Sequence, residues 1–286
     1  MSDISRVGVI GCGIMGSGVA EVCAKQGLDV LVAVRTPAAA DAGRGRIAAS
    51  LDRAVRKQKV TVAERDAALG RIAFTADLGE LADRQFVVEA APEQESVKLD
   101  LFGTLDKVVD APDAILASTT SSIPIIRLGR ATQRPEQVIG VHFFNPVTSL
   151  PLVELVGSLL TAPATTARAR ALVTSVLGKQ VIESPDRAGF VVNSLLIPYL
   201  VAAIRMVESG AVSAEVIDSG MTLGCAHPIG PLALADLIGL DTVASIAMAL
   251  YEELKDPHLA PPPLLLRMVE GGVLGKKTGR GFYPYG

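Results

Sequence analysis

The chain has 286 residues, long enough for about two domains, and 49% of them are apolar, so a sizeable core can form. Its 27 basic and 30 acidic residues are interspersed and give a formal net charge of −3. This balance excludes the basic stripe of a nucleic-acid-binding protein and the polybasic arm of a membrane-surface protein.

The cysteines and the longest apolar stretch limit the cellular setting. Cys12, Cys23 and Cys225 show neither Cys-x-x-Cys nor Cys/His ligand spacing, which indicates reduced thiols and no zinc site. The N-terminal segment lacks the pattern of a secretory signal. The apolar stretch 195–204 contains a proline and is too short to span a bilayer. We therefore expect a cytoplasmic protein with no membrane partner and no nucleic-acid partner.

The first predicted strand, residues 6–10, leads into a glycine-rich loop and a helix predicted over 14–26. A G-x-G-x-x-G loop between a strand and a helix is typical of a dinucleotide-binding site, with the phosphates at the helix N-terminus. The first glycine allows the tight turn, the second lets the backbone approach the pyrophosphate, and the third lets helix and strand pack closely. The predicted cofactor loop consists of Gly11, Cys12, Gly13, Ile14, Met15 and Gly16.

The second predicted strand, residues 29–34, bears on the choice of cofactor. A site for NAD usually carries an acidic residue at this strand's end, where it binds the adenosine ribose hydroxyls. Val34 stands there and cannot accept those bonds. Arg35 and Thr36 follow, and they offer a cation and a hydroxyl suited to a 2′-phosphate. We predict that NADP(H) is favoured over NAD(H); alternatively, Arg35 points to solvent and NAD binds without its usual acid.

Short Val- and Ile-rich runs continue to alternate with helical segments. Further strands are predicted over 71–74, 85–91, 114–119, 138–144 and 179–184, and further helices over 38–58, 95–109 and the stretch before the last strand. Such alternation is typical of a mostly parallel sheet covered on both faces. The predicted fold of residues 1–184 is therefore α/β, a Rossmann-type doubly wound parallel sheet.

The segment "HFFNPVTSLPLVELV" places His142 at the end of an apolar run and Glu154 twelve residues later. Taken alone, such a histidine is more often a hydrogen-bonded core residue, and such a glutamate a solvated charge. The spacing suffices for a strand, a turn containing Pro146 and Pro151, and a neighbouring strand. The two side chains can therefore meet.

After Pro185 the apolar residues recur at helical spacing to the end of the chain. We predict an all-helical C-terminal domain over 185–286. Its apolar content exceeds what a domain of this size needs, which favours a homodimer with a buried inter-subunit face. The alternative is a large core that packs on the first domain.

Several motifs are more specific than the fold pattern. They are "STTSS" (118–122), "HFFNPV" (142–147), "PLVELV" (151–156), "GFVVN" (189–193), "HPIGPLALADLIGLDT" (227–242) and "GKKTGRGFY" (275–283). In order and spacing they resemble the L-3-hydroxyacyl-CoA dehydrogenase family, and its short-chain 3-hydroxybutyryl-CoA members in particular. The resemblance implies a Rossmann domain with a helical dimerisation and substrate-cleft domain. It also implies interconversion of (S)-3-hydroxyacyl-CoA and 3-ketoacyl-CoA by hydride transfer with a nicotinamide cofactor, without a metal.

The resemblance also implies roles for four catalytic residues. His142 would take the proton of the substrate hydroxyl, because imidazole can accept and return a proton near neutral pH. Glu154 would orient that imidazole and stabilise its charged form. Ser121 would bind the substrate oxygen, although it could also cap a helix before "IPIIRL". Asn193 would hold the substrate carbonyls, or else it is a buried amide that satisfies backbone groups.

Further contacts are implied in the same way. The residues that line the cofactor would include Glu93, Lys98, Ser121, Asn145 and Lys277. Ser50, Lys57 and Ser121 would contact the CoA substrate, although Lys57 could belong to a solvated basic helix face.

Three positions depart from the family pattern: Thr119 replaces the usual asparagine, Ser194 a common arginine, and Val34 the acidic residue. They leave two alternatives open. One is a β-hydroxy-acid or sugar-acid dehydrogenase of the same fold, and the other is a repurposed homologue without redox activity.

Overall fold

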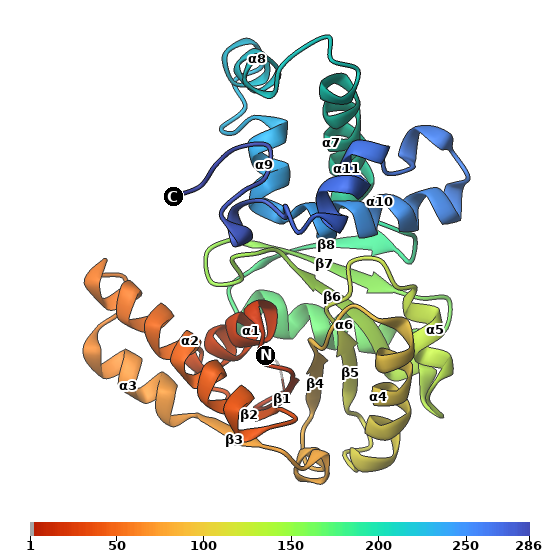
Figure 1. Ribbon diagram of the computed structural model, residues 1–286. Helices are drawn as coiled ribbons and strands as arrows, with labels where there is room; N and C mark the ends of the chain where they lie inside the picture. Colours follow the sequence, from red (N-terminus) through yellow and green to blue (C-terminus); the bar gives the residue numbers. More distant parts are fainter. Residues whose placement is uncertain (1–2) are drawn as a thin grey trace. The chain divides into compact units, whose positions relative to one another are not determined.

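A computed structural model describes residues 3–286, which divide into two compact units between Asp186 and Arg187. The first unit is built on one eight-stranded sheet with the strand order β3-β2-β1-β4-β5-β6-β7-β8 (Figure 1). All neighbouring strands are parallel except β6 and β7, which are antiparallel. The strands are β1 (Arg6–Ile10), β2 (Asp29–Ala33), β3 (Ile72–Thr75), β4 (Phe86–Glu89), β5 (Ile115–Ser118), β6 (Val138–Phe143), β7 (Leu152–Gly157) and β8 (Gln180–Pro185).

Helices cover both faces of this sheet. On one face, alternate strand residues such as Val7 and Val9 pack in a common core with α1, α2 and α6. The other face meets α5, because a side chain at Gly140 would strike Ile125. The helices of this unit are α1 (Ile14–Lys25), α2 (Pro37–Arg56), α3 (Val62–Gly70), α4 (Glu95–Val108), α5 (Ile125–Arg130) and α6 (Pro163–Ala171).

The helix α3 was not predicted from the sequence. It begins with a capping box, in which the Thr61 hydroxyl accepts from the Glu64 amide and the Glu64 carboxylate accepts from the Thr61 amide. The spacing Thr-x-x-Glu is a known signal for a helix start and could have located it.

The second unit is helical and has its own apolar core, which includes Ile197, Leu200, Val243 and Leu250. Its helices are α7 (Val192–Glu208), α8 (Ala214–Ser219), α9 (Pro231–Ile238), α10 (Leu240–Leu254) and α11 (Pro263–Glu270). The predicted fold, a Rossmann-type parallel sheet followed by an all-helical domain, is confirmed.

Candidate active site

His142 and Glu154 face each other across the only antiparallel pairing of the described sheet. They are direct partners in the β6–β7 ladder, so their side chains project from the same face. His142 Nδ1 lies 2.7 Å from Glu154 Oε2, and the two residues are only 5% and 0% exposed. An ionised carboxylate can only accept hydrogen bonds, so Nδ1 donates. In the neutral ring the proton is therefore on Nδ1, and Nε2 can accept a hydrogen bond.

Ser121 contacts this second ring nitrogen. Its Oγ lies 3.1 Å from His142 Nε2, in the loop that follows β5. The alternative helix-cap role for Ser121 is wrong. Helix α5 begins only at Ile125, and the Asp186 carboxylate accepts from the amides of Ile125 and Ile126 at 2.7 and 2.8 Å. Ser121, His142 and Glu154 therefore form one hydrogen-bonded chain.

Glu93 fixes the loop that carries Ser121. Its Oε1 accepts from the Ser121 amide at 3.0 Å, from the Ser122 hydroxyl at 3.1 Å and from the Thr120 hydroxyl in a short bond. Burial raises the pKa of Glu93, but the Lys98 ammonium and the bonds from Thr120 and Ser121 outweigh it, so this pKa lies below its ordinary value. Glu93 is thus held as a carboxylate beneath the serine loop.

Lys98 lies next to Glu93 and also pairs with Glu89, a residue that the sequence reasoning missed. The Lys98 ammonium lies 2.7 and 2.8 Å from the two carboxylate oxygens of Glu89 and 3.3 Å from Glu93 Oε2. Glu89 ends β4 and is fully buried, and Lys98 is 1% exposed. An acidic residue at the end of the apolar strand "FVVE" was the available signal, since the carboxyl ends of parallel strands meet at one sheet edge.

The glycine loop has the geometry of a phosphate-binding turn. Gly11 has φ of +85°, and a Cβ there would lie 2.7 Å from the Ala90 carbonyl oxygen. A Cβ at Gly16 would lie 2.1 Å from the Gly11 oxygen, so no side chain fits at either position. A Cβ at Gly13 would meet no atom within 4 Å, and no side chain caps the start of α1 there. The backbone amides at this helix start are open to a pyrophosphate, so the loop fits a dinucleotide.

The side chains after β2 differ in exposure. Val34 is buried, while Arg35 and Thr36 are exposed. The Thr36 hydroxyl caps α2 by accepting from the Ala39 amide at 3.2 Å. The first turn of α2 contains no acidic residue. The end of β2 therefore presents a guanidinium and no carboxylate.

A pocket of about 430 Å³ lies between α1, α2 and the loop that follows β6. Ser50, Asn145 and Ile14 from the predicted set all line it, together with Arg53. Glu21 of α1 also lines it: burial raises the pKa of Glu21, against a hydrogen bond from Ser50 and the charges of Lys25 and Arg53. Lys57 lies outside the residues lining this pocket, exposed at the end of α2.

Asn193 and Lys277 belong to the helical unit. Asn193 is buried in the first turn of α7. The Lys277 ammonium lies 2.6 Å from both oxygens of Asp241.

The C-terminal tail of the helical unit, residues 275–286, is anchored on a second acidic residue that the sequence reasoning missed. The fully buried carboxylate of Asp236 accepts from the amides of Phe282 and Tyr283 and from the Tyr285 hydroxyl, each at 3.0 Å. Burial and this carboxylate raise the pKa of Tyr285 to about 12. These hydrogen bonds hold the tail in place, and with it Lys277.

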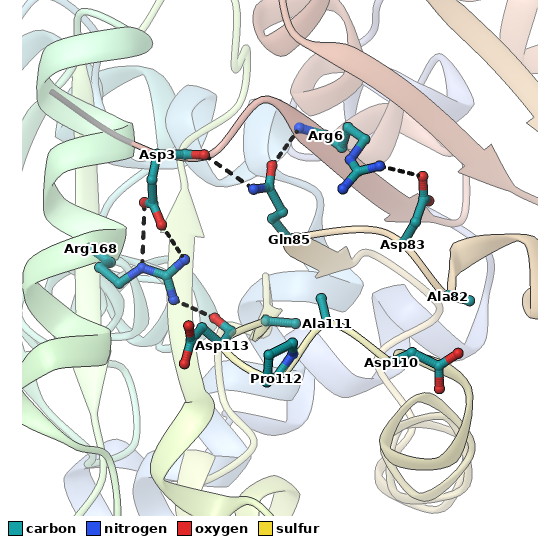
Figure 2. A pocket seen from close by; sticks show the side chains of 11 residues that line it. Asp3, Arg6, Ala82, Asp83, Gln85, Asp110, Ala111, Pro112, Asp113 and Arg168 are labelled. Atoms are coloured by element: carbon teal, nitrogen blue, oxygen red, sulfur yellow. Dashed lines mark hydrogen bonds and ion pairs between the residues drawn. The ribbon is translucent and has the colours of Figure 1, made fainter.

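A separate pocket lies at the opposite edge of the sheet, where β1, β4 and β5 begin (Figure 2). Arg168 forms an ion pair with Asp3 across it, and the Gln85 amide donates to the Asp3 carbonyl oxygen. None of the predicted site residues lines this pocket.

Residues 3–286 offer neither a metal cluster nor a single membrane-spanning helix. No group of three His, Cys, Asp or Glu side chains is placed to hold a metal ion. No single helix has the length and apolar content needed to cross a membrane; only α9 and α10 taken together reach them, and they are bent by 98°.

A mostly parallel sheet with a G-x-G-x-x-G loop, and a hydrogen-bonded Ser–His–Glu chain beside the carboxyl ends of β5 and β6, defines a dinucleotide-dependent oxidoreductase. Comparison with known proteins makes the class specific. The family model described as "3-hydroxyacyl-CoA dehydrogenase, NAD binding domain" matches residues 6–187, and the one described as "3-hydroxyacyl-CoA dehydrogenase, C-terminal domain" matches 189–285. The chain belongs to the 3-hydroxyacyl-CoA dehydrogenase family, whose N-terminal domain indicates a nicotinamide cofactor.

Individual relatives agree with this assignment. The chain is 57% identical over all 286 residues to a 3-hydroxybutyryl-CoA dehydrogenase of Mycobacterium tuberculosis, and each sequence is covered completely. It is 38% identical to a human mitochondrial hydroxyacyl-coenzyme A dehydrogenase, covering 99% of this chain and 91% of the relative. The crystal structure of an (S)-3-hydroxybutyryl-CoA dehydrogenase from Ralstonia eutropha has a TM-score of 0.93 at 44% identity, covering 99% of this chain and all of the other.

Proposed function

We propose that the protein interconverts (S)-3-hydroxybutyryl-CoA and acetoacetyl-CoA, with His142 as the acid-base residue. The observation that carries this proposal is the hydrogen-bonded chain from the buried Glu154 through the buried His142 to the part-buried Ser121, which presents one imidazole nitrogen at a serine hydroxyl. The names of the relatives at 57% and 44% identity support a short acyl chain on CoA.

The proposed residues divide the work of a ketone–alcohol interconversion. A nicotinamide dinucleotide whose pyrophosphate the glycine loop holds would supply the hydride or accept it. In the oxidation direction His142 Nε2 accepts the proton of the substrate hydroxyl, and Glu154 stabilises the imidazolium through Nδ1. In the reduction direction His142 returns that proton to the carbonyl oxygen, which also accepts a hydrogen bond from Ser121. Asn193 holds the substrate carbonyls, and Asn145, Glu93, Lys98 and Lys277 act on the cofactor side.

The test is an assay of the purified protein with acetoacetyl-CoA and with free acetoacetate. Ser50 and Lys57 are proposed to contact CoA, and binding energy from a remote group helps to orient the reacting carbon. We expect acetoacetyl-CoA to be reduced with a far higher kcat/KM than free acetoacetate. Equal efficiency would favour a free-acid or sugar-acid dehydrogenase, and no reduction with either cofactor would favour a homologue without redox activity.

We further propose that NADP(H) is preferred, because Arg35 rather than a carboxylate follows β2. An Arg35→Ala variant is expected to weaken NADPH binding by about tenfold to a hundredfold, the range of a charge-assisted hydrogen bond, and to change NADH binding little. Titration of both reduced cofactors by fluorescence measures this. Arg56→Ala is the control, because Arg56 is an exposed arginine in the last turn of α2, the helix that follows Arg35. A wild-type preference for NADH would contradict the assignment.

We also propose a homodimer formed through the helical unit. Large apolar side chains are exposed on several of its elements, including Leu195 of α7 at 74% and Leu223 after α8 at 87%. Large exposed apolar patches often mark a protein–protein interface. We expect sedimentation at micromolar concentration to give twice the chain mass, and Leu195→Glu combined with Leu223→Glu to give the monomer. A wild-type monomer would refute the proposal.

A further inference from the structure

Glu89 is a fully buried carboxylate to which the proposed reaction assigns no step. Isolated buried charges are costly, so each is expected to be paired and hydrogen-bonded. Glu89 has four such contacts: Lys98 on both oxygens, the Ser118 hydroxyl at 2.6 Å and the Ala91 amide at 2.7 Å. Every one of these partners lies at the carboxyl edge of the sheet, beside the site.

The contacts of Glu89 lead to the serine loop by two routes. Its backbone carbonyl accepts from the Thr119 amide at 3.0 Å, two residues before Ser121. Its side chain binds the Lys98 ammonium, which in turn lies 3.3 Å from Glu93, the carboxylate that accepts from the Ser121 amide.

The same residue adjoins the glycine loop. The Ala90 amide donates to the Ile10 carbonyl oxygen at 2.8 Å, and the Ala90 carbonyl oxygen lies where a Cβ on Gly11 would project. Because Glu89 accepts from the Ala91 amide, its carboxylate fixes the turn that supports Gly11. Glu89 therefore lies between the two loops that have to be aligned for hydride transfer.

The charges of this network make the alignment sensitive to Glu89. Lys98 is shared by two carboxylates, and it lies closer to Glu89 than to Glu93. If Glu89 lost its charge, Glu93 would remain as the charged partner of the buried Lys98 ammonium. The distance between Lys98 and Glu93 would then shorten. Glu93 would then move relative to the amide and hydroxyls that it holds in residues 120–122.

We propose that Glu89 is a positioning residue: through Lys98 and Glu93 it sets the place of the Ser121 hydroxyl on His142. This inference rests on the proposed function only for its kinetic consequence. The position of Ser121 on the imidazole is a structural property that can be measured without substrate.

The first test is Glu89→Gln, which keeps the shape of the side chain and removes its charge. We expect kcat for acetoacetyl-CoA reduction at saturating cofactor to fall about tenfold to a hundredfold, the usual cost of a small displacement of a reacting group. The KM for acetoacetyl-CoA should change far less. Glu95→Gln is the matched control. Glu95 follows Glu89 by six residues, is part-exposed and forms an ion pair with Arg127, so this variant should retain wild-type kcat.

A second measurement uses the ¹⁵N chemical shifts of the His142 ring. The chain has only three histidines, so comparison with His142→Gln assigns the signals. We expect the Nε2 signal to shift in Glu89→Gln and not in Glu95→Gln. If the wild type does not reduce acetoacetyl-CoA, the proposed function fails, and this shift still tests the positioning role.

A double variant separates positioning from mere stability. Removing one partner of a buried ion pair is strongly destabilising, whereas replacing both with neutral groups can restore stability. We expect Glu89→Gln with Lys98→Met to recover the melting temperature while the Nε2 signal, measured without cofactor, stays shifted. The double variant also serves if Glu89→Gln alone does not fold. Recovery of the wild-type ring shifts in the double variant would overturn the proposal, and so would unchanged kcat and ring shifts in folded Glu89→Gln.

Discussion

Replacement of His142 by glutamine is expected to lower kcat by about two to four orders of magnitude, the usual contribution of a general acid-base group. Glutamine can hydrogen-bond to both Ser121 and Glu154, but it cannot take a proton from the substrate and return it. The KM for the cofactor should stay near its wild-type value, because His142 belongs to β6 and not to the glycine loop. Steady-state kinetics with acetoacetyl-CoA and fluorescence titration of the cofactor measure the two effects.

Two further variants make this result interpretable. Glu154→Gln should reduce kcat by a smaller factor. The glutamine can still accept a hydrogen bond from the His142 ring, and only the negative charge beside the ring is lost. His258→Gln is the control, since His258 is exposed on a surface turn. Near-wild-type turnover in His142→Gln would remove the acid-base assignment.

Replacement of Asp236 by alanine is expected to detach the tail, residues 275–286, from α9. The carboxylate accepts three hydrogen bonds, and bonds to a charged group contribute about 1.5–3 kcal/mol each, so the helical unit should lose several kcal/mol of stability. Faster hydrogen exchange at Phe282 and Tyr283, together with earlier thermal unfolding, would report this loss.

Activity should fall in the Asp236 variant because the tail carries Lys277. Asp241→Ala removes only the ion pair of Lys277 and leaves the three bonds to Asp236 in place. We expect that control to keep the slow exchange of the wild-type tail. An Asp236→Ala protein with unchanged tail exchange would show that apolar packing and the Tyr283–Asp218 hydrogen bond hold the tail without the Asp236 carboxylate.

The strands, the glycine loop and the fold could be predicted from the sequence, because each depends on a local pattern of apolar residues and glycines. The pairing of His142 with Glu154 could be anticipated because a single turn joins their strands. The partners of Glu89 could not, since Lys98 and Ser118 come from separate elements and meet only in the folded sheet. Ser121 illustrates the same limit: its position before an apolar run suggested a helix cap, whereas Asp186, far along the chain, fills that role.

The β6–β7 ladder has a consequence for how this protein can vary. His142 and Glu154 are opposite each other because of strand pairing. Phe144, the first residue of the loop of residues 144–151, packs its ring edge-on against the His142 ring, with centroids 4.7 Å apart. A slip of one residue in that pairing would turn one of the two side chains to the other face of the sheet. Beyond Phe144 and Asn145, the loop can change its length or sequence while both strands keep their register. Its residues Pro146, Val147 and Thr148 line the pocket beside α1 and α2, so new ligand contacts can evolve there without disturbing proton transfer.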